Sequence, residues 1–135
     1  VAVTRGIGTI VLDIRRGDGP TSCFNYTMAS VATTDALIAR EPATAAAVVR
    51  AIVKTQRALA ADAALATKAG TMLFPPSEAA LIGELIRRDV PYYDASISPD
   101  FVAGMNQFGR DLGILKSAPA YEDVVATQYA PLWRG

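Results

Sequence analysis

The stretch that decides the fold is TTDALIAREPATAAAVVRAIVKTQRALA, residues 33–60, because two helix patterns follow each other there. Thr33 or Thr34 can cap a short helix over residues 35–40, since a threonine hydroxyl accepts a hydrogen bond from an amide of the first turn. Pro42 suits the start of the next helix, where a proline loses no helical hydrogen bond. We therefore expect two consecutive helices here and a helical character for the rest of the chain.

The second of these helices, over about residues 43–60, is amphipathic. Apolar residues recur at spacings of three and four, which is the period of one helix face. The expected inner stripe consists of Ala45, Val48, Val49, Ile52, Val53, Gln56 and Leu59. The opposite face carries Arg50, Lys54 and Arg57, which form either a docking surface or simply a solvated basic side.

Shorter helical segments are expected to follow, over residues 62–71, 77–88, 98–113 and 121–126. Ser77 and Ser98 are their expected caps, because serine is a preferred residue at the start of a helix. The segment that begins at Ser98 has an apolar stripe at helical spacing, which we interpret as core: Phe101, Met105, Phe108 and Leu112. Gly113 is expected to end it.

Two strands are expected before residue 33. Residues 7–15, IGTIVLDIR, are rich in β-branched and apolar side chains, which favours a buried strand. Residues 16–22 are dense in turn formers, and residues 26–32 form a second candidate strand. Because an isolated strand pair is marginal in water, these strands need covering helices or strands from elsewhere. The sequence thus predicts an α/β class, with two strands and about five helices in one unit, residues 1–135.

Composition limits the possible functions. The 13 basic and 13 acidic residues cancel, which argues against a nucleic-acid partner. The chain has no histidine and one cysteine, Cys23, so a Cys–His pair, a Ser–His–Asp triad and a structural zinc site are excluded within it. The carboxylates are scattered singly. We therefore expect no catalytic residues, no metal and no cofactor, and a protein that is not an enzyme.

The order of these segments resembles a known family. GTIVLD and RRGDGP, residues 8–13 and 15–20, are similar to the last strand and connector of the second lobe in nitrate/sulfonate/taurine-type substrate-binding proteins of ABC importers, the NMT1/THI5-like family. MASVATTDALIAREP, residues 28–42, resembles the family's returning strand and the segment behind it. Residues 45–59 and 77–88 resemble the helices that follow.

The resemblance implies a type II periplasmic binding protein fold, in which two lobes close on a ligand. The chain would then be its helix-rich C-terminal portion. Residues 1–24 would form the end of the second lobe and the connector, and residues 25–135 the crossover strand and the C-terminal helices of the first lobe. The missing N-terminal half would be a partner, or a self-association would substitute for it.

The same resemblance gives candidate ligand-binding residues. Asn25, Tyr26 and Thr27 would lie where the chain crosses between the lobes, so their polar groups could hydrogen-bond a small ligand. Alternatively, they only begin a strand. Arg15 or Arg16 could offer a guanidinium fork to an anionic group, or could form salt bridges or a solvated connector.

The implied function is capture of a small solute, of the sulfonate, nitrate, aromatic acid or pyrimidine class, for an ABC permease in the membrane. A periplasmic or membrane-anchored extracytoplasmic location follows from it. Tyr92 and Tyr93 could stack on a ring-bearing solute, or fasten their own loop. The alternatives are an enzyme similar to thiamine-pyrimidine synthases and a ligand-sensing domain of a regulator.

Overall fold

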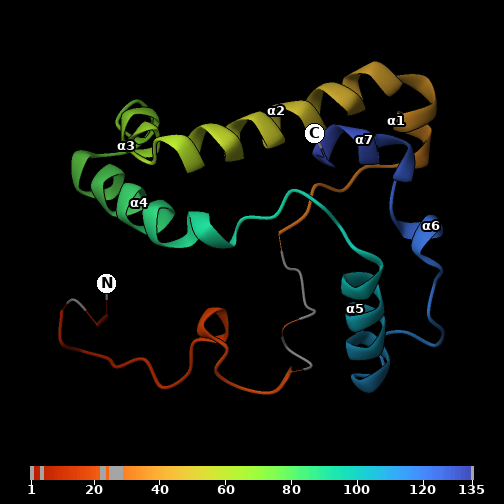
Figure 1. Cartoon of the computed structure of the whole chain (residues 1–135), viewed down its shortest axis with the longest axis horizontal. Helices are drawn as coiled ribbons and strands as arrows, with labels where there is room; N and C mark the ends of the chain where they lie inside the picture. Colours follow the sequence, from red (N-terminus) through yellow and green to blue (C-terminus); the bar gives the residue numbers. More distant parts are fainter. Residues whose placement is uncertain (1, 4, 22–23, 25–28, 135) are drawn as a thin grey trace. The chain divides into compact units, whose positions relative to one another are not determined.

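The computed structural model describes residues 2–3, 5–21, 24 and 29–134 (Figure 1), except the side chains of Arg15 and Arg134. Its elements are η1 (Ile14–Arg16), α1 (Asp35–Arg40), α2 (Pro42–Ala61), α3 (Ala64–Gly70), α4 (Pro76–Asp89), η3 (Val90–Tyr92), α5 (Pro99–Asp111), α6 (Tyr121–Val124), η4 (Thr127–Tyr129) and α7 (Ala130–Arg134).

The chain divides into two compact units. Unit 1 comprises Val1–Ser30 and Ile97–Val125, and unit 2 comprises Val31–Ser96 and Ala126–Gly135. Each is described by itself below. The assignment of residues 1–24 and 25–135 to parts of two lobes stays a prediction.

The expected α/β class is wrong, because the described residues form helices, turns and loops and none of them forms a strand. In the first expected strand, the side chains of Ile7 and Val11 are 76% and 92% exposed. The backbone of residues 8–12 makes no hydrogen bond to another described residue. Of the second expected strand, residues 29–32 are loop and residues 26–28 lie outside the described residues. β-Branched residues favour a strand only when a neighbouring strand pairs with them, and the described part of the chain supplies none.

In unit 2, the start of the helical stretch is as predicted. The backbone amide of Leu37 donates to the hydroxyl of Thr34 at 3.2 Å, which caps α1. Pro42 begins α2. Helix α7 packs against α2, and the hydroxyl of Tyr129 donates to the carbonyl of Pro42 at 3.2 Å. Together these contacts fix the N-terminal half of α2.

The inner face of α2 is narrower than predicted. Ala45 and Val53 are buried, whereas Val48 and Ile52 are exposed. The two exposed residues lie one turn apart on one face of the helix, so part of the predicted apolar stripe faces solvent.

Helices α3 and α4 form the most tightly packed pair in unit 2. A side-chain carbon at Gly83 would overlap the hydroxyl of Thr67, and one at Gly70 would lie 3.3 Å from the Cβ of Ala79. Ala79 is completely buried. The helices can approach this closely because small residues meet at both points of contact.

The predicted cap at Ser77 is wrong. Helix α4 begins one residue earlier, at Pro76, and its cap position is held by Pro75 without a side-chain hydrogen bond. A proline at the first helical position lacks only an amide that would have had no helical partner. Ser77 therefore lies inside the first turn.

In unit 1, α5 begins and ends as predicted. The amide of Phe101 donates to the hydroxyl of Ser98 at 3.1 Å. Gly113 has a φ of +70°, the left-handed conformation that commonly ends a helix.

The buried face of α5 differs from the predicted stripe. Phe108 and Leu112 are exposed, whereas Asn106 is only 9% exposed. The side-chain amide of Asn106 donates to the carbonyl of Pro119 at 2.9 Å. Gly109 is buried where Leu115 approaches the helix closely. The helix therefore packs against the segment that follows it through positions next to the predicted stripe, of which Phe101 and Met105 are half-buried.

The close contact at Gly83 gives a first prediction. Gly83→Ala should destabilise unit 2 by about 1–2 kcal/mol, because overlap with Thr67 outweighs the gain in helix propensity. Urea denaturation followed by circular dichroism measures the change in the free energy of unfolding. The double variant Gly83→Ala/Thr67→Ala should recover part of the loss. A single variant as stable as the parent would contradict the packing.

The buried amide of α5 gives a second prediction. Asn106→Ala should lower the free energy of unfolding by about 1–2 kcal/mol, because the carbonyl of Pro119 loses its donor. Gln107→Ala, on the exposed side of the same helix, is the control and should change it by at most about 0.5 kcal/mol. Equal losses in the two variants would refute the role of Asn106.

Candidate functional site

Of the residues predicted to bind a ligand, the structure describes only the backbone of Arg15. Asn25, Tyr26 and Thr27 lie outside the described residues. The backbone of Arg15 lies in η1, and its side chain is not described. Their role in ligand binding stays a prediction.

Arg16, the other arginine of this connector, interacts with its own loop. Its guanidinium nitrogens lie 3.8 Å from a carboxylate oxygen of Asp13 and 3.6 Å from one of Asp18. The amide of Asp13 also donates to the carboxylate of Asp18 at 3.0 Å. Arg16 could bind an anionic group, form salt bridges or belong to a solvated connector. The structure shows the salt bridges. Both ion pairs are partly solvated, so they add little to stability.

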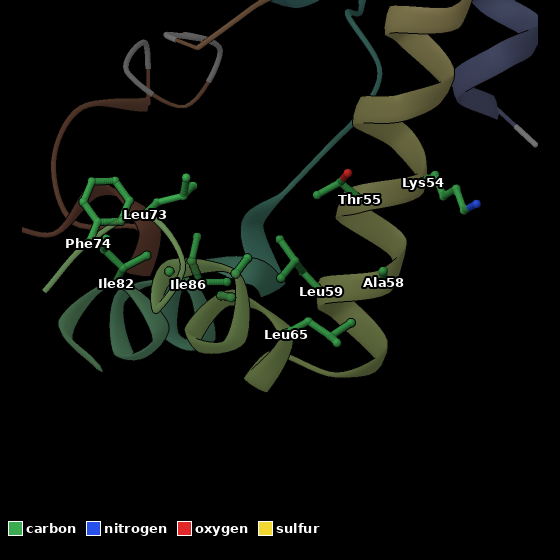
Figure 2. Close-up of a pocket in the computed structure, with 12 residues that line it drawn as sticks. Lys54, Thr55, Ala58, Leu59, Leu65, Leu73, Phe74, Ile82 and Ile86 are labelled. Atoms are coloured by element: carbon green, nitrogen blue, oxygen red, sulfur yellow. The ribbon is translucent and has the colours of Figure 1, made fainter. Parts of the chain in front are cut away.

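Unit 2 contains an open apolar groove between α2, α3 and α4 (Figure 2). Its volume is about 480 Å³, within the range of small-molecule pockets. We call it the α2–α4 groove. It is lined by Lys54, Thr55, Ala58 and Leu59 of α2, Leu65, Ala66, Ala69 and Gly70 of α3, Leu73 and Phe74 of the following turn, and Ile82 and Ile86 of α4.

Small residues and a tight turn create this groove. Ala58, Ala66 and Ala69 leave space where larger side chains would fill it. After α3, the amide of Phe74 donates to the carbonyl of Gly70 at 2.8 Å, which closes the turn. This turn places Leu73 and Phe74 at one end of the groove, as Figure 2 shows.

The lining of the groove is almost entirely aliphatic and aromatic. The hydroxyl of Thr55 donates to the carbonyl of Ala51 at 2.8 Å, so its proton is already engaged. Lys54 marks the end opposite Phe74, and its ammonium group points away from the apolar side chains (Figure 2). The groove can therefore stabilise an occupant chiefly by removing apolar surface from water.

An apolar strip extends the groove along α2. Leu59, Thr55, Ile52 and Val48 follow one another at spacings of three and four, so they share a face of the helix. Ile52 and Val48 are exposed. Both positions belong to the stripe that helical spacing predicts as core, so their exposure is a difference from the prediction. The alanines at 58, 66 and 69 are the signal that could have indicated a recess.

The remaining candidate features lie on the surface of unit 2. Tyr92 and Tyr93 are both exposed, and a stacking role for them stays a prediction. Arg50, Lys54 and Arg57 are also exposed, and none of them forms an ion pair with another described residue. A docking role for this basic face stays a prediction.

Within the described ranges, no three acidic, cysteine or histidine side chains gather in a way that could hold a metal ion. None of the described helices combines the length and the hydropathy needed to cross a bilayer. No protein-family model, curated protein sequence or solved structure matches this chain.

Proposed function

We propose that the chain is the C-terminal portion of a substrate-binding protein of an ABC importer, similar to the nitrate/sulfonate/taurine-type proteins. It would capture a small solute by closure of two lobes and deliver it to a permease in the membrane. The intact protein would work outside the cytoplasm, in the periplasm or anchored to the membrane.

The observation that supports this function most is the agreement between the resembling segments and the helices. The segment over residues 28–42 leads into α1, and α2 and α4 cover the segments at residues 45–59 and 77–88. The strands that the resemblance also implies are absent from the described residues, so the helical segments alone support the proposal.

The solute would be a sulfonate, nitrate, an aromatic acid or a pyrimidine. Asn25, Tyr26 and Thr27 would donate and accept hydrogen bonds, and Arg15 would pair with the anionic group. A guanidinium suits a sulfonate or carboxylate because two of its N–H groups can point at two oxygens. Arg16 is less suited, since Asp13 and Asp18 already surround it.

A thermal-shift screen of the full-length protein tests this function, with taurine, nitrate, benzoate and an aminopyrimidine as probes. At a free concentration of about a hundred times its Kd, a ligand that binds the native state adds about 2.7 kcal/mol to the free energy of unfolding. This increase raises the Tm by several degrees. The probe should be recovered chemically unchanged. Absence of any shift with all four probes, or turnover of the probe, would overturn the proposal.

The two neighbouring arginines provide a matched pair of variants. Arg15→Ala should weaken binding of the stabilising probe by about ten-fold or more, because an anionic group would lose its charged partner. Arg16→Ala should change the Kd by less than about three-fold, since this guanidinium interacts with its own loop. Isothermal titration calorimetry measures both. Equal effects would remove Arg15 from the site.

A further inference from the structure

Residues 7–12, which we call the IGTIVL segment, are an uncharged apolar stretch that the single chain leaves in solvent. The side chains of Ile7 and Val11 are 76% and 92% exposed, and those of Ile10 and Leu12 are 51% and 52% exposed. Folded proteins rarely expose contiguous apolar side chains of this kind unless another surface covers them. The segment is therefore a contact surface of unit 1 in search of a partner.

The backbone of the IGTIVL segment is also unpaired within the described part of the chain. The amide of Ile7 donates to the carbonyl of Ala2, and the amide of Asp13 donates to the carboxylate of Asp18, both at 3.0 Å. Between these two bonds, residues 8–12 make no backbone hydrogen bond to another described residue. Five residues are about the usual length of one strand. Water can solvate such a backbone, but only a neighbouring strand pairs it and covers its apolar side chains at the same time.

The exposed turn after α3 is apolar too, but it is not available for pairing. The amides of Leu73 and Phe74 both donate to the carbonyl of Gly70, at 3.0 and 2.8 Å. Pro75 and Pro76 follow directly, and a proline has no amide to donate. The combination of exposed apolar side chains with a free backbone therefore distinguishes the IGTIVL segment from this turn.

The composition of the IGTIVL segment suits pairing with itself. Four of its six residues are β-branched, and it contains neither a proline nor a charged residue. Short segments of this composition stack as strands from many copies of one chain, because identical uncharged side chains can pack together without repulsion. The same segment of another copy is therefore a partner that fits both its backbone and its side chains.

The charges on either side of the segment favour an antiparallel arrangement. Arg5 precedes it and Asp13 follows it. In antiparallel pairing centred on Thr9, Arg5 of one copy lies opposite Asp13 of the next, whereas parallel stacking in register would place like charges together. Asp13 also interacts with Arg16 of its own loop, so the flanking charges set the orientation more than they add to the affinity.

We infer that the IGTIVL segment is a self-assembly surface, on which the same segment of further copies of this chain pairs as an antiparallel strand. In the single chain the segment is not a strand, because the neighbour that β-branched residues need comes only from other copies. A sheet of two strands is marginal in water, and its two outer edges stay open. Further copies therefore add to both edges, so assembly is cooperative and begins above a threshold concentration. This inference does not depend on solute import, and its test needs no solute.

Incubation of the purified chain over a range of concentrations tests the inference, with thioflavin T fluorescence and amide I infrared spectra as readouts. We expect assembly after a lag, with an antiparallel β band that the monomer lacks. Val11→Lys should lengthen the lag by about ten-fold or more, because every added strand would bring another charge into the apolar stack. Circular dichroism of the monomer should show unchanged helix content, since Val11 is 92% exposed in the single chain.

Leu73→Lys is the matched control. It introduces the same charge at an apolar side chain that is 76% exposed, in the turn whose backbone is already engaged. It should change the lag by less than about two-fold, because position 73 lies outside the paired segment. Equal effects of the two substitutions, or a parent chain that forms no β band at concentrations up to about 1 mM, would overturn the inference.

Hydrogen exchange locates the paired residues. In the assembled state the amides of residues 8–12 should exchange at least about a hundred-fold more slowly than in the dilute monomer, because each would be bonded to a neighbouring copy. Slow exchange of these amides already in the dilute monomer would mean a partner within the same chain. That result, or protection in the assembly that leaves out residues 8–12, would overturn the inference.

Discussion

Helices α3 and α4 approach each other so closely that a side-chain carbon at position 83 would overlap the hydroxyl of Thr67. The second contact, between Gly70 and Ala79, lies where α3 ends. Together the two contacts hold α4 against α3. Gly70 also lines the α2–α4 groove, so the packing of this helix pair positions one wall of the groove.

Large apolar side chains face solvent beside this packed pair. Phe74 and Leu73 belong to the short turn after Gly70, and both side chains are exposed. Val48 and Ile52 continue the apolar surface along α2. The buried core of the described residues is correspondingly small and contains only Ala45, Val53, Ala79, Val125 and Tyr129 among apolar residues.

Except for the cap expected at Ser77, features set by neighbouring residues could be predicted from the sequence, whereas features set by distant partners could not. Thr34 and Ser98 cap their helices with their own side chains. Their position just before each helix was therefore sufficient to predict both caps. The strand expected at residues 7–15 depended on a pairing partner that the described chain does not provide. The buried face of α5 depended on the carbonyl of Pro119, thirteen residues after Asn106. Helical spacing carries no information about such a contact.

The candidate site follows the same division. The ligand residues Asn25, Tyr26, Thr27 and Arg15 came from a resemblance, and the structure describes none of their side chains. The groove, by contrast, is an assembly of three helices and a turn, which no local pattern specifies. A ¹³C-edited NOE experiment on the chain tests the packing of α3 against α4 most directly. We predict NOEs between the Hα protons of Gly83 and the side-chain protons of Thr67. Absence of these NOEs in a folded chain would contradict the account.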